Sequence, residues 1–345
     1  MSSQYLIHHN STIKEALVKL DISLGKALFI VDDNNRVLAS ISDGDIRRAL
    51  IKGHSITELA IDVAHKTFKF IQQNTTKKEE LEQFKANKIT LIPILNSNME
   101  LVKIVDISKI KAMLPLDAVI MAGGKGARLL PLTKQTPKPL LKVGNKPIIE
   151  YNTDRLASYG IRNINITVNY LGEQIVDYFK DNNKYQIDFN YIKEDRPLGT
   201  IGALKLIKNF NNDYILLMNS DLLTNADFED IFNNFLLKEG DALVATIPYK
   251  VNIPYGVVET KAGYVTNIKE KPSYTYYSNA GIYIFKKECL DFVPKDTFFN
   301  ATDLIETLLA KNKKIINYPI LTYWLDIGKH EDFEKAQEDI KHIKL

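Results

Sequence analysis

The feature that most constrains the fold is an alternation that begins near Leu116. Continuously apolar segments, each typical of a buried strand, alternate from there on with segments of helical periodicity. The apolar segments are AVIMA at 118–122, NINITVNY at 163–170, YILLMNSD at 214–221, ALVATIPY at 242–249, GVVET at 256–260 and AGIYIF at 280–285. They predict an α/β fold, with a Rossmann-like, mixed and mostly parallel sheet and helices on both faces. In such sheets ligands bind where the parallel strands end.

A glycine loop follows the first of these strands. Gly123, Gly124 and Gly126 come directly after AVIMA. Without Cβ atoms, the backbone N–H groups of such a loop can close on phosphate oxygens. The GGxG spacing fits neither the dinucleotide motif GxGxxG nor the P-loop motif GxxxxGK[ST], because Lys125 precedes the last glycine. Taken alone, the loop is better explained as a plain turn between a strand and a helix.

Two cations follow the loop and favour a phosphate ligand. Arg128 can grip phosphate oxygens in a bidentate way, and Lys138 supplies a compact point charge. Pro137 and Pro139 flank Lys138 and restrict its backbone. A solvated basic loop would explain either cation alone, but the combination indicates a polyphosphate site.

The stretch GGKGARLLPLTKQTPKPLLKVGNKP strongly resembles the signature of sugar-1-phosphate nucleotidyltransferases, with Ala127 where the family has threonine. Further motifs of that family follow in the family's order, over roughly 117–330. They are EDRPLGTIGAL at 194–204, NSD at 219–221, IKEKP at 268–272, NAGIY at 279–283 and WLDIG at 324–328. The resemblance implies that the phosphate of a sugar 1-phosphate attacks the α-phosphorus of a nucleoside triphosphate and that pyrophosphate leaves.

The resemblance also implies a role for individual residues. Arg128 and Lys138 would be catalytic, steadying the leaving pyrophosphate and bridging the two reacting phosphates. The nucleotide would be held by Ala122, Gly123, Gly124, Gly126 and Gly199. The sugar phosphate would be held by Glu194, Glu259, Glu270, Lys271 and Asn279.

Asp221 and Asp326 each end an apolar segment, and two carboxylates converging there suit Mg²⁺, with Mn²⁺ as the alternative ion. Either residue alone is more often a turn or a helix cap. The family resemblance is what favours a metal site. The six histidines show no metal-ligand spacing, and we expect them to be structural or surface residues.

The first third of the chain contains a weak internal repeat, in which residues 27–46 resemble residues 90–110. Each copy predicts a strand, a polar turn, a strand and a helix start, and Ser11 and Thr75 are candidate N-caps of the preceding helices. The pattern resembles a tandem pair of CBS domains, the small α+β sensor modules that bind adenosyl ligands.

In that family Ser42 and Asp45 of the first copy would hold phosphate and ribose of AMP or ATP. The second copy has Asp106 and Lys109 at the matching places, which departs from the family's pattern. The alternative is a pair that only packs, dimerises or braces the rest of the chain. With Pro115 as a natural breaker, we expect a regulatory module at 1–114 and a catalytic domain at 115–345.

Composition excludes several classes of protein. A net charge of +3 over 345 residues gives no footprint for nucleic acid or an anionic membrane. The single cysteine, Cys289, cannot form an internal disulfide, and we expect it to be a small buried side chain. With no targeting segment and no long apolar run, we expect a cytoplasmic protein, and from the CBS pair a homodimer.

The arrangement of a CBS pair before the catalytic domain resembles that of guanylyltransferases serving bacterial nonulosonic-acid and surface-glycan pathways. Among these are enzymes that act on glucosamine 1-phosphate for legionaminic acid. GTP and glucosamine 1-phosphate are therefore the expected substrates, although no local residue selects guanine over uracil, thymine or cytosine. Two other classes stay open. One is a catalytically silent regulatory protein that binds sugar nucleotide, and the other is a glycosyltransferase that uses NSD to hold a metal.

Overall fold

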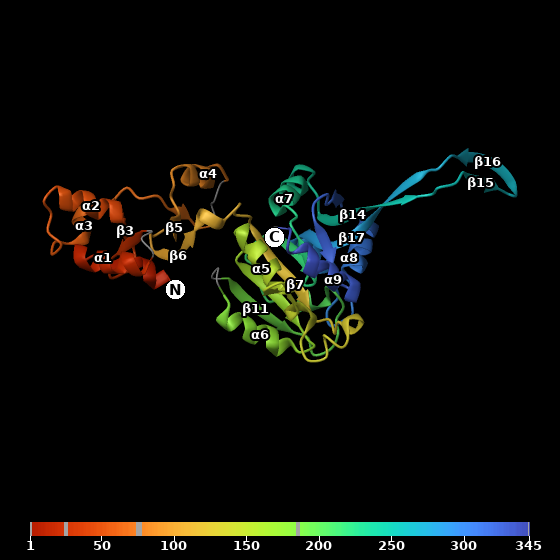
Figure 1. Ribbon diagram of the computed structural model, residues 1–345, viewed down its shortest axis with the longest axis horizontal. Helices are drawn as coiled ribbons and strands as arrows, with labels where there is room; N and C mark the ends of the chain where they lie inside the picture. Colours follow the sequence, from red (N-terminus) through yellow and green to blue (C-terminus); the bar gives the residue numbers. More distant parts are fainter. Residues whose placement is uncertain (1, 24–26, 74–77, 184–186, 344) are drawn as a thin grey trace. The chain divides into compact units, whose positions relative to one another are not determined.

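The computed structural model describes residues 2–23, 27–73, 78–183, 187–343 and 345. The chain divides into two compact units, Met1–Met113 and Leu114–Leu345, which are considered separately (Figure 1). Within the described residues, no helix is both long and apolar enough to cross a membrane.

The first unit repeats one small α+β pattern. Each half has a three-stranded sheet in which two strands run parallel and the third pairs antiparallel. The first half consists of η1 (Ser2–Tyr5), β1 (Leu6–His8), α1 (Ile13–Ile22), β2 (Leu28–Val31), β3 (Val37–Ile41), α2 (Asp43–Ile51) and α3 (Ala60–Val63). The second half consists of β4 (Ile71–Gln72), α4 (Lys78–Ala86), β5 (Leu91–Leu95), β6 (Leu101–Asp106) and η2 (Ile107–Lys109).

The two polar turns show the repeat in atomic detail. Asp32 accepts hydrogen bonds from the backbone N–H groups of residues two and four positions later, and Asn96 does the same in the second half. Asn35 and Met99 take left-handed backbone conformations at the same place in each turn, with φ of 60° and 63°. The halves differ after the last strand, because the second continues as a short 3₁₀ helix rather than an α-helix.

The predicted cap of the first helix was wrong by one residue. Thr12, not Ser11, is the N-cap of α1, and it forms a reciprocal capping box with Glu15. The predicted cap Thr75 lies outside the described residues.

The second unit is built on a seven-stranded sheet in the order β11-β10-β7-β12-β17-β14-β18. The first four run parallel, β17 is antiparallel to its neighbours, and β14 and β18 are parallel to each other. The strands are β7 (Leu116–Ala122), β10 (Asn163–Val168), β11 (Asp188–Lys193), β12 (Tyr214–Asn219), β14 (Ala242–Asn252), β17 (Ser273–Lys286) and β18 (Ile315–Pro319). The predicted mixed, mostly parallel sheet is confirmed.

Helices cover both faces of this sheet (Figure 1). Consecutive residues of its central strands point to opposite faces, and both sets of side chains are buried. Val119 and Leu217 pack on one face with Leu304 of α8, while Ala118 and Leu216 are buried on the other. The helices are α5 (Ile148–Ser158), α6 (Gly172–Asp181), α7 (Phe228–Leu237), α8 (Ala301–Ala310) and α9 (His330–Asp339). The short elements are η3 (Ala127–Leu129), η4 (Lys138–Leu140), η5 (Gly202–Leu206), η6 (Lys287–Phe292), β8 (Lys142–Val143), β9 (Lys146–Pro147), β13 (Leu222–Thr224) and β19 (Trp324–Asp326).

Strands β14 and β17 run past the sheet as a two-stranded ribbon. A bulge between Val244 and Thr246 lies opposite Gly281, which has a φ of 69°. Beyond the bulge the ribbon leads to a hairpin of β15 (Val257–Lys261) and β16 (Tyr264–Lys269), which extends away from the sheet (Figure 1). The segment at 256–260, predicted as a strand of the main sheet, belongs instead to this hairpin. Cys289 is fully buried as predicted, and burial raises the pKa of its thiol to about 11.

Asp117 stabilises the end of β7 that lies away from the glycine loop. Its fully buried carboxylate accepts hydrogen bonds from the backbone N–H groups of Asn211 and Asn212 and from the Asn212 side chain. We predict that Asp117→Ala lowers the free energy of unfolding by about 2–4 kcal/mol, because it leaves these donors unpaired. Urea unfolding measures the loss. Asp213→Ala, at an exposed position of the same turn, is the control, and a similar loss in both variants would contradict the prediction.

Candidate functional site

A pocket of about 480 Å³ opens where the parallel strands end. Its walls come from the glycine loop, from η4, from the segments after β11 and β12, and from the segment before α8. Of the residues predicted from the sequence, the pocket is lined by Gly123, Gly124, Gly126, Arg128, Lys138, Glu194, Gly199 and Asp221. The lining residues run from Met121 to Gly328, so parts of the chain that are distant in sequence lie around one space.

The three loop glycines differ in why they are needed. Gly126 has a left-handed backbone with φ of 61°, and a Cβ there would lie 2.9 Å from Thr133 Cγ2 and 3.0 Å from Lys138 Cβ. A Cβ on Gly123 would lie 2.9 Å from the Glu194 carboxylate, whereas one on Gly124 would meet nothing within 4 Å. Gly126 therefore brings the loop against Lys138, and Gly124 leaves space on the open side. Ala122 is buried at the end of β7 and does not line the pocket.

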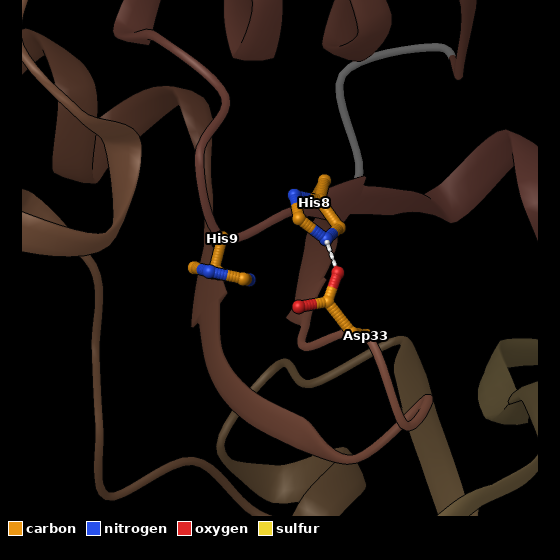
Figure 2. A group of neighbouring side chains, drawn as sticks. All are labelled: His8, His9 and Asp33. Atoms are coloured by element: carbon orange, nitrogen blue, oxygen red, sulfur yellow. Dashed lines mark hydrogen bonds and ion pairs between the residues drawn. The ribbon is translucent and has the colours of Figure 1, made fainter.

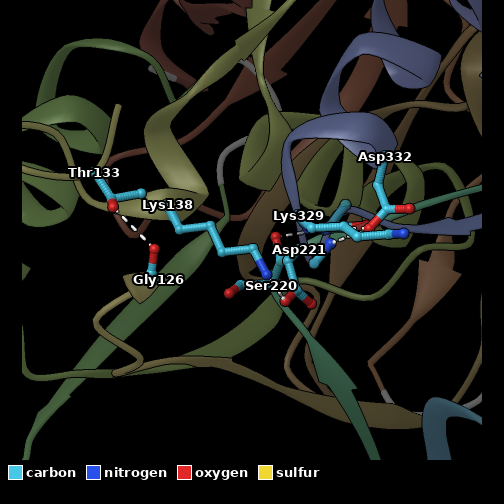
Figure 3. Close-up of polar contacts among 9 residues, drawn as sticks. Gly126, Thr133, Lys138, Ser220, Asp221, Lys329 and Asp332 are labelled. Carbon is cyan, nitrogen blue, oxygen red and sulfur yellow. Dashed lines mark hydrogen bonds and ion pairs between the residues drawn. The ribbon is translucent and has the colours of Figure 1, made fainter. Parts of the chain in front are cut away.

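Lys138 forms an ion pair with Asp221 across the pocket wall (Figure 3). Lys138 lies in η4, directly after Pro137, whose φ of −64° sets the direction in which the chain enters that turn. The side chain is only 11% exposed, so its ammonium group is held by protein rather than by solvent. The Thr133 hydroxyl donates to the Gly126 carbonyl at 2.9 Å and ties this segment to the glycine loop.

Asp221 and Asp326 lie side by side because β13 and β19 pair antiparallel, with Leu222 opposite Asp326. The backbone N–H of Ile327 donates to the Asp221 carbonyl at 3.0 Å. Oδ1 of each aspartate is buried and has no hydrogen-bond partner among the described residues. Two buried carboxylate oxygens without partners suit a hard divalent cation such as Mg²⁺, so these residues fit the predicted metal.

The pKa of Asp326 is shifted by its surroundings. Burial, together with the nearby Asp221 carboxylate, raises the pKa of Asp326 to about 6, although Lys138 and Arg128 act in the opposite direction. Arg128 itself is exposed in η3 at the pocket rim. The site therefore combines two crowded carboxylates with two cations.

Glu194 and Gly199 line the pocket but also have structural tasks. Glu194 is buried and accepts a hydrogen bond from the Leu198 N–H at 3.1 Å, and burial raises the pKa of its carboxyl. Gly199 has a φ of 76°, and a Cβ there would lie 2.6 Å from the Phe299 carbonyl oxygen. The close approach of the Phe299 backbone therefore explains by itself why residue 199 is a glycine.

The other predicted sugar-phosphate residues do not line the pocket. Glu259 lies on the hairpin and binds Lys269 at 2.6 Å, and Glu270 and Lys271 follow β16. Asn279 bonds to the Tyr283 hydroxyl at 2.7 Å and to the backbone of Gly281. The structure thus leaves these four residues outside the cavity.

The pocket also contains residues that the sequence analysis did not assign. Asn219 and Ser220 could have been found, since they belong to the NSD motif. Thr167, Phe298 and Asn300 stand in no family motif, and only the fold brings them to the pocket.

In the first unit, Ser42 and Asp45 form a reciprocal capping box at the start of α2. Ser42 Oγ accepts from the Asp45 N–H, and the Asp45 carboxylate accepts from the Ser42 N–H at 2.9 Å. Arg48 also pairs with Asp45. Hydrogen bonds to Ser42 and the Arg48 charge lower the pKa of Asp45 despite the opposing effect of its partial burial.

Comparison with known proteins decides the family. The nucleotidyl transferase family model matches residues 117–343, and the CBS domain model matches residues 1–52. The chain belongs to the nucleotidyl transferase family.

Relatives within the family match about two thirds of this nucleotidyltransferase. The chain is 33% identical over 233 residues to the bifunctional protein GlmU of Methanococcus maripaludis, across 64% of the chain and 53% of that protein. It is 32% identical to the D-glycero-α-D-manno-heptose 1-phosphate guanylyltransferase of Aneurinibacillus thermoaerophilus, across 66% of the chain and 99% of that protein. The match thus spans about half of the first relative and nearly all of the second.

A solved structure is also similar. It is a Bacillus anthracis protein assigned as a glucose-1-phosphate thymidylyltransferase, in complex with sucrose. The TM-score is 0.55 at 25% identity, and the match covers 67% of this chain and 97% of the other. This likeness agrees with the mixed sheet of the second unit.

The raised pKa of Asp326 predicts an effect on stability. In the folded protein this carboxyl keeps its proton up to about pH 6, above its usual pKa of 3.8. Its contribution to stability is therefore full below pH 4 and is lost as the pH rises through 6. We predict that Asp326→Asn stabilises the metal-free protein by about 1–2 kcal/mol at pH 7.5, less than the full shift implies because part of the side chain reaches solvent.

Thermal unfolding at pH 7.5 and pH 4, with and without Mg²⁺, measures this effect. The gain should disappear at pH 4, and Asp326→Asn should also remove any increase in midpoint that Mg²⁺ gives the wild type. Glu331→Gln, at an exposed position in the first turn of α9, is the control that separates general loss of charge from the effect of the buried pair. A variant less stable than the wild type at pH 7.5 would contradict the assignment.

Proposed function

We propose that the chain transfers a nucleotidyl group from a nucleoside triphosphate to a sugar 1-phosphate and releases pyrophosphate. The observation that carries the proposal is the meeting, in one pocket, of the glycine loop, buried Lys138 and Asp221, with Asp326 beside Asp221 and an unpartnered oxygen on each carboxylate. Cations and N–H donors for phosphate thus stand beside oxygen ligands for a metal.

The reaction needs charge compensation more than proton transfer. The attacking sugar phosphate is already an anion, so an oxygen of that phosphate forms the new P–O bond while the bond from the α-phosphorus to the leaving pyrophosphate breaks. The main barrier is repulsion between anions. Lys138, at the pocket wall, would exchange its contact with Asp221 for contacts to the two reacting phosphates.

Other residues of the pocket would position the substrates. Arg128 at the rim would bind the departing pyrophosphate, and the N–H groups near Gly123 and Gly124 would bind the triphosphate. Asp221 and Asp326 would hold Mg²⁺ or Mn²⁺, which when bound neutralises phosphate charge and polarises phosphorus. Glu194, which lies beside Gly123, and Gly199 would contact the nucleotide or sugar.

We infer that GTP and glucosamine 1-phosphate are the substrates and that the product supplies nonulosonic acids such as legionaminic acid. The support is the N-terminal CBS match combined with the motif resemblance, and a relative that is itself described as a guanylyltransferase. The ribbon of β14 and β17 would have to bend toward the pocket before the remaining predicted residues could contact the sugar. These are Glu259, Glu270, Lys271 and Asn279.

A substrate matrix tests both the reaction and the substrates. GTP, UTP, CTP, dTTP and ATP are each combined with glucosamine, N-acetylglucosamine, glucose and mannose 1-phosphates, with and without Mg²⁺, and pyrophosphate release is measured. We expect strong turnover with GTP and glucosamine 1-phosphate, and only with the metal. Turnover with another pair would refute the named substrates alone, and no release with any pair would favour a silent regulatory protein.

We predict that Lys138→Ala lowers kcat by about 10²–10³-fold, because one preorganised charge facing the reacting phosphates is lost. Lys134→Ala, at an exposed position four residues earlier in the same segment, is the matched control and should retain wild-type kcat. Circular dichroism confirms that both variants are folded, since Lys138→Ala also leaves Asp221 without its ion pair. Equal kcat in the two variants would contradict the role.

We further propose that the first unit binds AMP or ATP at Ser42 and Asp45 and that the chain forms a homodimer. The support is the CBS match over residues 1–52, which contains both residues. A ribose would have to share Asp45 with the capping box and Arg48. Calorimetry at millimolar nucleotide should show heat that Asp45→Asn reduces, and a monomeric mass by light scattering would contradict the dimer.

A further inference from the structure

A second group of potential ligands lies in the first unit, far along the chain from the pocket residues. In the part of the chain that the structure describes, His8, His9 and Asp33 each offer a metal-ligand atom, and these atoms all lie within 4.8 Å of one another (Figure 2). The nucleotidyl transferase reaction has no use for them.

The parallel pairing of β1 and β2 brings these residues together. His8 is in register with Val31, so both strands end at the same edge of the small sheet, and His9 and Asp33 follow there. Ser42 follows β3, which runs antiparallel to β2 and ends at the opposite edge. The histidine cluster is therefore separate from the residues expected to bind an adenosyl ligand.

The polar atoms of the cluster are incompletely satisfied. Nε2 of His8 lies 2.9 Å from Oδ1 of Asp33, and the two imidazole ring centres are 4.2 Å apart. Nδ1 of His9 is buried and has no hydrogen-bond partner among the described residues. The buried Nδ1 of His9 therefore needs a partner, and it lies next to the His8 imidazole and the Asp33 carboxylate. A single ion could bind all three side chains.

We propose that His8, His9 and Asp33 bind a divalent transition-metal ion, with Zn²⁺ as the best fit. Two imidazoles and one carboxylate form a typical three-residue zinc set, which leaves a fourth position for water or an external ligand. Imidazole ligands favour Zn²⁺, Ni²⁺ or Cu²⁺ over Mg²⁺, which prefers oxygen. This site would therefore differ in selectivity from the pair formed by Asp221 and Asp326.

The spacing of His8 and Asp33 needs only a small adjustment. The ion would replace the proton shared between His8 and Asp33. At metal–ligand distances of about 2.0–2.1 Å, tetrahedral ligands lie roughly 3.3 Å apart, so the 2.9 Å separation would widen by a few tenths of an ångström. Asp33 has an exposed side chain at a turn and is free to make this movement.

The bound ion would join the end of β1 to the turn where the two halves of the unit meet. Asp32 fixes that turn by accepting from the N–H groups of Asn34 and Arg36. Asn35 of the same turn accepts from the Leu101 N–H through its carbonyl, at 3.0 Å, and donates to the Leu101 carbonyl through its side chain. An ion on Asp33 would therefore strengthen a contact between the first and second halves.

The full-length chain, stripped with chelator and kept in excess Mg²⁺ to saturate the oxygen site, provides the test. Zn²⁺ binding is measured by competition with a chromophoric chelator, and Co²⁺ is used as a spectroscopic substitute. We expect one Zn²⁺ site, and Co²⁺ absorption bands of tetrahedral intensity. His9→Ala and Asp33→Asn should each weaken Zn²⁺ binding at least tenfold and remove the Zn²⁺-dependent rise in unfolding midpoint.

His54→Ala is the matched control. His54 is also a surface histidine bound to a carboxylate, with Nδ1 2.7 Å from Oε2 of Glu58, but no third ligand lies near this pair among the residues that the structure describes. Its loss should leave Zn²⁺ affinity unchanged. Three outcomes would overturn the proposal: no Zn²⁺ binding by the wild type, equal binding by wild type and folded Asp33→Asn, or binding that disappears in Asp326→Asn instead.

Discussion

The buried ion pair between Lys138 and Asp221 is the contact on which the pocket depends. It joins the segment after the glycine loop to the end of β12, two parts of the chain separated by 83 residues. A buried ion pair adds little net stability, but removing one partner leaves an uncompensated charge. The pair therefore holds a cation at the pocket wall before any anion arrives, which is the preorganisation that phosphoryl chemistry requires.

The carboxylates on the other side of this pair are costly to the folded protein. Burial and mutual repulsion raise the pKa of Asp326, and two buried oxygens lack partners. Such groups would be removed by selection for stability alone, so their presence at the end of two paired strands points to a function. Burial of apolar side chains on both faces of the surrounding sheet offsets the free energy that these buried carboxylates cost.

Much of the fold could be predicted because continuous apolar strands are buried on both faces and leave a clear pattern in the sequence. The place of the pocket also agreed with the rule that ligands bind where parallel strands end, since the glycine loop and Asp221 come just after β7 and β12. The hairpin at β15 and β16 was misassigned because GVVET has the same apolar pattern whether it pairs in the main sheet or in a free ribbon. The positions of Phe298 and Asn300 in the pocket could not be predicted, because they depend on tertiary contacts that leave no local pattern in the sequence. The same holds for the contact between His8 and Asp33.

The ribbon formed by β14 and β17 has a consequence for how the chain can evolve. Its hairpin is almost entirely exposed, with Tyr264 at 79% and Ile268 at 64%, so few of its side chains contribute to the core. Substitutions there cost little folding free energy, in contrast to the tightly packed strands of the sheet. Substitutions in the hairpin can therefore alter what it contacts, its proposed sugar residue Glu259 included, without disturbing how the pocket folds. The pocket residues, by contrast, are held in one geometry by the buried strands around them.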